Sequence, residues 1–267
     1  MIKLAELLYR GVNRIRRALY RRGILKAKRL PVPVISVGAI AAGGSGKTPA
    51  TIAIAGALAD RGFRVGVLTR GYRRAGAGGV VDTLDPDRFG DEPVLIKQRL
   101  PNVEVIVGKN RYDNAIRKQV DVFVLDDGFQ HLQLHRDFDV VIDHPGFLRE
   151  GRSALKAADL VLPRKLKPRI PDSLRGKRVF AFAALADNRQ FFDSLGLELA
   201  GTQSFSDHHR YSTADVQAIK RAASDAHAEA IVTTEKDAVK IADPTIMAIP
   251  ADFVIDDLAP ILAAVGR

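Results

Sequence analysis

One short segment, AAGGSGKTP at residues 41–49, restricts the fold more than any other part of the chain. It follows an apolar, β-branched run, VISV at 34–37, and precedes a helix expected from Pro49 to about Asp60, since proline is favourable in a first helical turn. Glycines at such a place let the backbone turn with positive φ and surround phosphate oxygens with N–H groups. The segment therefore predicts a phosphate-binding loop between a buried strand and a helix.

Two residues at the end of the segment indicate a nucleotide and not a plain turn. Lys47 is placed to reach the β- and γ-phosphates, and the Thr48 hydroxyl is placed to bind Mg²⁺. The usual pattern, G-x-x-x-x-G-K-[ST], has a glycine where this chain has Ala41, at the outer edge of the loop. The predicted nucleotide-binding residues are Ala41, Ala42, Gly43, Gly44, Ser45, Gly46, Lys47 and Thr48.

The second half of such a site is an acidic residue that follows an apolar strand. VFVLDD at 122–127 supplies Asp126 and Asp127, which we expect to hold Mg²⁺ together with Thr48. Asp143, at the end of VVID, is an alternative candidate for the metal ligand. A single acid after a strand is commonly only a turn or cap residue, and we interpret Asp143 in this way. The paired acids favour Asp126 and Asp127 as the metal ligands.

Further β-branched runs alternate with helical segments along the first part of the chain. Strands are expected at 64–69, 103–107, 121–126, 138–143 and 158–163, and helices at 90–100 and 109–119. This alternation predicts an α/β fold, a P-loop NTPase-like, mostly parallel sheet with helices on both faces. Such sheets bind ligands at the carboxyl ends of their strands, where the loop and the acids are found.

A change of composition divides the chain at PRKLKPRIPDSLRGKR, residues 163–178, which is rich in Pro, Lys and Arg. We predict that an N-terminal helical segment and a P-loop domain come before a linker, and that a smaller α/β domain follows it. The predicted bounds are 1–30 for the N-terminal segment, which forms part of the first domain, 31–165 for the P-loop domain, 166–178 for the linker and 179–267 for the C-terminal domain.

The net charge of +10 is concentrated at the N-terminus, since ten of the 41 Lys and Arg residues fall within residues 1–30 beside a single acid. At about 100° per residue one helical face carries apolar side chains and the opposite face carries arginines. The apolar residues are Leu4, Leu8, Val12, Ile15 and Leu19, and the arginines are Arg10, Arg14, Arg17 and Arg21. This pattern favours a helix lying on an anionic membrane, with packing on the domain and nucleic-acid binding as alternatives.

The composition sets limits on other classes of function. The chain has no cysteine, which excludes disulfides and thiolate metal sites. It contains no apolar run of about 18 residues and no signal-peptide core, so we expect neither a spanning helix nor secretion. The protein is therefore expected in the cytoplasm.

At DDGFQHLQLHRDFDVVID, residues 126–143, the chain resembles the tetraacyldisaccharide 4′-kinases, the lipid A 4′-kinases of Gram-negative bacteria. Similar motifs run through most of the sequence, and their combination is specific. They are VPVISVG and GGSGKTP within 32–49, GDEP at 90–93, DDGFQH at 126–131, LRE at 148–150, FSDHH at 205–209 and TTEKDAVK at 233–240.

The resemblance implies a P-loop kinase that uses ATP and Mg²⁺. It would phosphorylate the 4′-hydroxyl of an acylated glucosamine disaccharide 1-phosphate in lipid A biosynthesis. This acceptor is a lipid of the cytoplasmic leaflet, so we expect a peripheral enzyme on the cytoplasmic face of the inner membrane, attached through residues 1–22. Candidates to grip the acceptor phosphate, each otherwise a solvated surface residue, are Arg70, Arg73, Arg111 and Arg149.

The resemblance also implies the catalytic residues, which are Asp91, His208 and Lys47. In the family the aspartate of the GDEP motif works with a histidine of the DH motif, and a sugar hydroxyl needs a group that accepts its proton. On the residues alone Asp91 would be interpreted as a helix N-cap. His209 stays an alternative to His208, and His131 either contacts the acceptor or pairs with a buried carboxylate.

Two other classes of protein compete with this interpretation. Membrane-associated ATPase switches of the ParA/MinD type carry a signature lysine five positions before the loop lysine, where this chain has Ala42. A nucleic-acid-binding protein would use the basic arm but leaves the loop and the acids unexplained, so no nucleic-acid partner is expected. Departures from the family, such as Ala39, Arg73 and the DHPGF segment at 143–147, leave the acyl-chain preference open.

Overall fold

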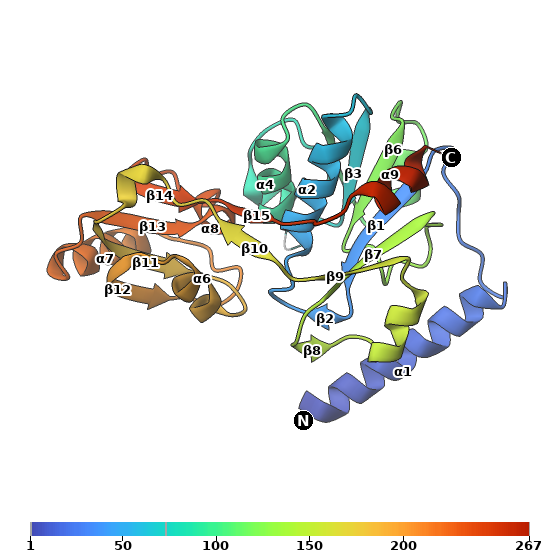
Figure 1. Ribbon diagram of the computed structural model, residues 1–267, viewed down its shortest axis with the longest axis horizontal. Coiled ribbons are helices and arrows are strands. Elements are labelled where there is room, and N and C mark those ends of the chain that lie inside the picture. The colour runs from blue at the N-terminus through green and yellow to red at the C-terminus, as the bar shows by residue number, and fades with distance from the viewer. Residues whose placement is uncertain (1, 73, 267) are drawn as a thin grey trace. The chain divides into compact units, whose positions relative to one another are not determined.

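The computed structural model describes residues 2–72 and 74–266 (Figure 1). The chain forms two compact units. One contains Met1–Lys165 together with Phe253–Arg267, and the other contains Leu166–Asp252. Each unit is built on a mostly parallel sheet, which confirms the α/β fold predicted from the alternation of strands and helices.

A seven-stranded sheet forms the first unit, in the order β4-β5-β3-β6-β1-β7-β9. Its neighbouring strands run parallel except for β4, which is antiparallel to β5. The strands are β1 Val34–Ala39, β3 Val65–Thr69, β4 Gly79–Val80, β5 Glu104–Val107, β6 Val122–Asp126, β7 Phe138–Asp143 and β9 Leu160–Pro163. A separate antiparallel pair is formed by β2 Ala41–Ala42 and β8 Phe147–Leu148.

Helices of the first unit pack on the sheet, except α1, which lies beside β8. They are α1 Ile2–Arg21, α2 Lys47–Ala59, α3 Pro86–Phe89, α4 Asp91–Arg99, α5 Arg111–Ala115 and α9 Ala259–Val265, with a 3₁₀ helix at Arg152–Ala157. Side chains alternate along a strand, and Phe123 and Leu125 of β6 join an apolar cluster with Ala115 of α5 on one face. Asp126 points to the other face, where it accepts a hydrogen bond from Thr51 of α2.

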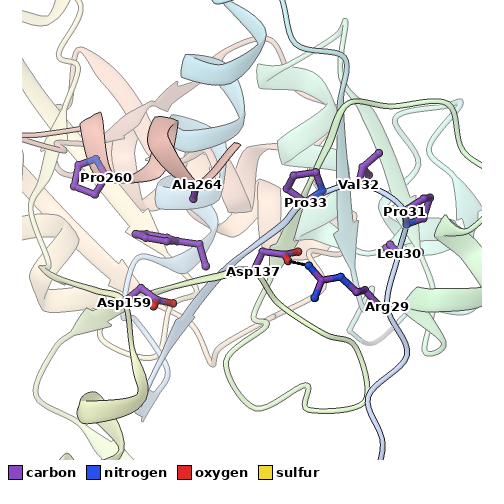
Figure 2. Close-up of a pocket in the computed structure, with 10 residues that line it drawn as sticks. Arg29, Leu30, Pro31, Val32, Pro33, Asp137, Asp159, Pro260 and Ala264 are labelled. Atoms are coloured by element: carbon purple, nitrogen blue, oxygen red, sulfur yellow. Dashed lines mark hydrogen bonds and ion pairs between the residues drawn. The ribbon is translucent and has the colours of Figure 1, made fainter. Parts of the chain in front are cut away.

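A cavity of about 650 Å³ lies at the amino ends of β1, β7 and β9 (Figure 2). Arg29 and Asp137 form an ion pair in its wall. The phosphate loop follows the carboxyl end of β1, so this cavity lies at the sheet edge opposite the predicted site. Its lining residues are Arg29, Leu30, Pro31, Val32, Pro33, Asp137, Phe138, Asp159, Pro260 and Ala264.

The second unit has a four-stranded parallel sheet in the order β12-β11-β13-β14. Its strands are β11 Arg178–Ala183, β12 Glu198–Ser204, β13 Ala230–Thr234 and β14 Ile246–Ile249, and its helices are α6 Asn188–Ser194, α7 Thr213–Asp225 and α8 Glu235–Ala238. Phe182 and Ile219 are fully buried in one of its two apolar clusters. Where the chain passes between the units, β10 Leu166–Pro168 pairs with β15 Ala251–Phe253.

The unit boundaries differ from the predicted domain limits at two places. Residues 166–178, expected to be a linker, contain β10 and a 3₁₀ helix at Asp172–Leu174, and Leu174 is buried in a core cluster of the second unit. Residues 253–267, expected in the C-terminal domain, belong to the first unit. The apolar face of α9 explains this return, because Ile261 and Val265 are buried.

The N-terminal helix is shorter than the predicted segment of residues 1–30. Helix α1 ends at Arg21, and Gly23 follows with a φ of 72°, a left-handed conformation that commonly ends helices. The backbone N–H of Ile24 donates to the carbonyl of Leu19 in this turn. Residues 24–30 therefore leave the helix and run toward β1.

Two residues of the predicted apolar stripe of α1, Val12 and Ile15, lie at the surface, and a third, Leu19, is partly buried. Val12 and Ile15 are 56% and 63% exposed, whereas Asn13 is buried and Arg17 is partly buried. The alternative in which this stripe packs on the domain is therefore wrong for Val12 and Ile15. The side chains of residues 2–10, which include Leu4 and Leu8, lie outside the described part. In the described chain, no helix is both long and apolar enough to cross a membrane.

Candidate active site

The predicted phosphate loop follows the carboxyl end of β1, which lies between β6 and β7 in the sheet. Gly43, Gly44 and Gly46 have φ values of 71°, 53° and 79°, in the left-handed region that side-chain-bearing residues rarely adopt. Gly46, which has no side chain to cap the helix, comes directly before Lys47, the first residue of α2. The loop therefore has the left-handed glycines and the adjoining helix start that are typical of a phosphate-binding loop.

Ala41 replaces the first glycine of the usual pattern without strain. It lies in the short strand β2, is fully buried, and pairs with Leu148 of β8. Strand backbone has a negative φ, so no glycine is needed there. The departure seen in the sequence thus falls at a position where the fold accepts a side chain.

Asp126 ends β6 beside β1 and β3, and its side chain is almost completely buried. Its carboxylate accepts hydrogen bonds from Thr51 Oγ1 at 3.0 Å and from Thr69 Oγ1 at 3.2 Å. Thr51 is on the helix that follows the phosphate loop, and Thr69 ends β3. These two bonds fix the acid between the loop helix and the sheet.

Asp127 is more exposed and meets the phosphate loop directly. It has a positive φ of 50°, which turns its side chain away from the strand direction. Arg149 donates to its two oxygens at 3.0 and 2.7 Å, and Lys47 Nζ lies 3.7 Å from Oδ1. The loop lysine and the acid pair, which are far apart in sequence, are therefore brought together as predicted.

The two neighbouring acids have opposite pKa shifts. Burial, together with the charges of Glu92 and Asp127, raises the pKa of Asp126 to about 7. Burial also works to raise the pKa of Asp127, but the charges of Lys47 and Arg149 and the hydrogen bond from Arg149 outweigh it and hold that pKa well below its usual range. Asp127 therefore ionises at a lower pH than Asp126.

Asp143 has a different environment from the pair. Its carboxylate accepts a hydrogen bond from the exposed side chain of Arg152, nine residues later. An exposed pair of this kind contributes little to stability. This geometry fits the interpretation of Asp143 as a residue that ends a strand.

Asp91 is buried at the first position of α4, and Gly90 occupies the N-cap position. The N-cap interpretation of Asp91 is therefore not what the structure shows. Gly90 has a φ of 96°, and a Cβ there would lie 3.1 Å from the Tyr72 carbonyl, so the turn into Asp91 requires glycine. The next residue, Glu92, influences Asp126 electrostatically, and the sequence patterns did not single it out.

Arginines gather on the other side of the acid pair. Arg111 is 7% exposed, and burial and the charge of Arg70 lower its pKa, while the two aspartates oppose that effect. His131 lies among the same charges: burial and the nearby arginines lower its pKa to about 4. His131 is therefore neutral at physiological pH. The arginines acting on it are Arg111, Arg136, Arg16 and Arg70. Arg73 lies outside the described residues.

In the second unit, the two adjacent histidines have different surroundings. The ring of His209 stacks on Phe205 with centroids 4.7 Å apart and has its Nε2 3.2 Å from Asp215. His208 has a positive φ of 59°, and its Nε2 lies 3.3 Å from Lys236 Nζ. His209 is thus part of an aromatic cluster, whereas His208 belongs to a charged one.

The TTEKDAVK motif supports the loop that carries these histidines. Thr234 caps α8, and fully buried Asp237 accepts a hydrogen bond from the backbone N–H of Ala184 at 2.9 Å. Lys236 Nζ lies 3.3 Å from Asp207 as well, and Lys240 donates to the carbonyl of His209 at 3.0 Å. The motif, which had no assigned role in the sequence, therefore holds the DHH segment in place.

Comparisons with known proteins agree with this arrangement. The chain matches the family described as tetraacyldisaccharide-1-P 4′-kinase over residues 1–173 and 164–265. It is 38% identical to the tetraacyldisaccharide 4′-kinase of Anaeromyxobacter sp. (strain K), covering 93% of this chain and 82% of that protein. The chain belongs to the tetraacyldisaccharide 4′-kinase family.

Further relatives extend the match. The tetraacyldisaccharide 4′-kinase of Pelobacter propionicus is 37% identical, over 88% of this chain and 81% of that protein. The crystal structure of the "apo" form of LpxK from Aquifex aeolicus in complex with ATP superimposes with a TM-score of 0.81 at 29% identity, over 100% of this chain and 98% of that one. These matches support the kinase and give no support to an ATPase switch of the ParA/MinD type.

The raised pKa of Asp126 predicts a pH-dependent stability. Because the folded protein holds this proton up to about pH 7 and the unfolded chain only to its ordinary pKa of 3.8, the stability due to Asp126 is lost as the pH rises through this window. We expect Asp126→Asn to gain stability over wild type as the pH rises from 3.8 to about 7, by at most about 1.4 kcal/mol per pH unit, and to level off above that range. Urea unfolding of the metal-free protein measures this, and a difference independent of pH would contradict the shift.

Proposed function

We propose that this protein transfers the γ-phosphate of ATP to the 4′-hydroxyl of an acylated glucosamine disaccharide 1-phosphate. Membership of the 4′-kinase family supports the reaction, and one observation in the chain itself carries it. Lys47 of the phosphate loop and Asp127 of the DDGFQH motif lie 3.7 Å apart at the carboxyl edge of the sheet. Phosphoryl transfer needs such a combination of phosphate binding and charge stabilisation.

The proposed nucleotide site is the loop of residues 41–48. Its backbone N–H groups surround the phosphates, and Lys47 neutralises charge on the β- and γ-phosphates. The Aquifex relative was crystallised with ATP, which supports ATP as the donor here. The left-handed glycines Gly43, Gly44 and Gly46 allow this close approach of backbone to ligand.

The residues at this edge fit Mg²⁺. Mg²⁺ prefers oxygen ligands and is typically held by one or two carboxylates together with nucleotide phosphates. Asp126, Asp127 and the Thr48 hydroxyl supply that donor set, and Thr51, one turn after Thr48, is already hydrogen-bonded to Asp126. When bound, the ion would neutralise charge that develops on the transferred phosphoryl group.

Asp91 is the proposed base for the acceptor hydroxyl, and His208 of the second unit is proposed as a further catalytic residue. Asp91 is buried at the first position of α4, directly after the left-handed Gly90. The separate packing of His209 with Phe205 supports His208 as the histidine that serves the reaction. Lys236 and Asp207 hold His208 within the second unit.

The arginines beside the acid pair are proposed to bind the phosphate of the acceptor. Arg70 and Arg111, both candidates from the sequence, act together on His131, and Arg16 of α1 joins them. A group of like charges that lowers the pKa of a neighbouring histidine is a favourable place for a dianion. Arg149 has a different proposed role, because it binds Asp127 with both of its terminal nitrogens.

Helix α1 is the proposed membrane contact, and the protein is proposed to act on the cytoplasmic face of the inner membrane. Val12 and Ile15 point away from the sheet, and Ile24 and Leu25 just after the helix are 64% and 38% exposed. Basic side chains surround these apolar ones, and the exposed ones are Arg14, Arg21, Arg22 and Lys26. Apolar residues flanked by exposed positive charge are the pattern of a helix on an anionic lipid surface.

Transfer of label from γ-labelled ATP to tetraacyldisaccharide 1-phosphate in detergent micelles tests the kinase. Wild type should label the lipid. Lys47→Ala should lose about 10³-fold or more of the rate, because loop contacts to the phosphates stabilise the transition state. Asp91→Ala should lower turnover by roughly 10²- to 10⁴-fold and leave ATP binding intact.

Two outcomes would contradict this proposal. If wild type hydrolyses ATP without labelling the lipid, the protein is an ATPase. If Asp91→Ala turns over at the wild-type rate, the proposed base is wrong even though the kinase stands.

Vesicle binding tests the proposed role of α1. Val12→Asp combined with Ile15→Asp should weaken co-sedimentation with anionic phospholipid vesicles about tenfold or more, because burying each apolar side chain contributes about 1.5–3 kcal/mol. Leu84→Asp is the matched control, since Leu84 is 56% exposed elsewhere in the first unit. Equal sedimentation of wild type and the α1 variant would refute the membrane contact.

A further inference from the structure

A buried ion pair joins helix α1 to the segment beside the phosphate loop. Arg17 donates from Nε to Glu150 Oε2 at 3.0 Å and from Nη2 to Glu150 Oε1 at 2.9 Å. Glu150 is 4% exposed, and Arg17 also donates to the Phe129 carbonyl at 3.2 Å. The guanidinium lies over the Phe129 ring, 4.3 Å from its centroid. This two-pronged pairing fixes the side chain of Arg17 in direction as well as in distance.

Glu150 lies where three functional segments meet. Gln130, of the DDGFQH motif, donates to Glu150 Oε1 and to the carbonyl of Ala39, both at 3.0 Å. The backbone N–H groups of Arg149 and Glu150 lie 2.7 and 3.3 Å from the carbonyl of Ile40, directly before the phosphate loop. Glu150 is therefore tied to α1 and to the acid motif through its buried carboxylate, and to the entrance of the loop through its backbone N–H.

The residue next to Glu150 reaches the acid pair. Arg149 holds Asp127 through two hydrogen bonds, and its own carbonyl accepts a hydrogen bond from Asn13 of α1 at 3.1 Å. Helix α1 thus holds residue 149 through the main chain and residue 150 through its side chain. Asp127 is therefore linked to α1 through Arg149.

We propose that Arg17 is a positioning residue for phosphoryl transfer: through Glu150 it sets the position of Arg149, and thereby the orientation of Asp127 and the entrance of the phosphate loop. This inference rests on the proposed kinase function. It gives α1 a second role, in which the polar face of the helix organises the active site while the apolar face meets the lipid. Residues that orient metal ligands through a second contact commonly affect activity strongly.

The variants are chosen to separate a positioning role of the Arg17–Glu150 ion pair from a purely structural one. Arg17→Met alone leaves Glu150 as a buried charge without its main partner, which lowers stability. Arg17→Met combined with Glu150→Met replaces the pair by apolar side chains, a change that is often neutral for stability. Arg17→Lys keeps a positive charge but lacks the two-pronged geometry. Arg61→Met is the control, because Arg61 is an exposed arginine of the first unit that has no part in the proposed nucleotide, acceptor or membrane contacts.

The experiment measures kcat, the KM for ATP and the melting temperature of each variant, with γ-labelled ATP and tetraacyldisaccharide 1-phosphate in detergent micelles. For the Met/Met variant we expect a melting temperature near that of wild type and a kcat lower by roughly 10- to 100-fold, with the KM for ATP changed much less. The kcat of Arg17→Lys should fall between those of wild type and the Met/Met variant, and Arg61→Met should match wild type.

The possible results separate the two proposals. If the Met/Met variant has both the melting temperature and the kcat of wild type, the ion pair only stabilises the fold and the positioning role is wrong. If Arg61→Met loses as much activity as Arg17→Met, the effect comes from the loss of a positive charge in general and the positioning role is again wrong. If wild type itself labels no lipid, the proposed function fails first, and the inference fails with it.

Discussion

The carboxylate of Asp126 is the contact on which the arrangement of the first unit depends. It ends the central strand β6 and receives hydrogen bonds from Thr51 of the helix after the phosphate loop and from Thr69 of the neighbouring strand. Because these groups are buried, each bond is strong and the loss of a partner would be costly. The phosphate loop and the acid motif, about 80 residues apart, are therefore held in one place. Asp127 then extends from this fixed point toward Lys47 and Arg149.

Helix α1 is built into this arrangement. Its polar side carries Asn13 and Arg17, which bind the 149–150 segment, and its exposed side carries Val12 and Ile15. An ordinary surface helix has the reverse orientation, with apolar residues toward the sheet. The inversion is stable because a buried carboxylate, Glu150, gives the arginine a partner that water would otherwise supply. The proposed function uses both sides of α1: the polar side holds the 149–150 segment, and the exposed side is the proposed lipid contact.

The sequence predicted the parts of the site that repeat a general physical pattern. Buried strands, the glycine loop and the paired acids Asp126 and Asp127 each follow from local chemistry. The two-residue strands β2 and β8 have too few residues for any periodicity, and Glu92 gains its effect only by folding next to Asp126. The sequence did not predict that Arg17 points inward. Helical periodicity shows which residues share a face, but it does not show what that face contacts. The return of 253–267 to the first unit likewise depends on tertiary packing of Ile261 and Val265.

The central claim is that the loop and the acid pair form one Mg²⁺-dependent nucleotide site. Calorimetric titration of ATP, with Mg²⁺ and with a chelator, tests it most directly on wild type and on Asp126→Asn combined with Asp127→Asn. The account predicts that Mg²⁺ tightens ATP binding to wild type and has no such effect on the variant, which still binds ATP through Lys47 and the loop. A variant that keeps the full Mg²⁺ effect would contradict the account, because the metal would then be held by other residues.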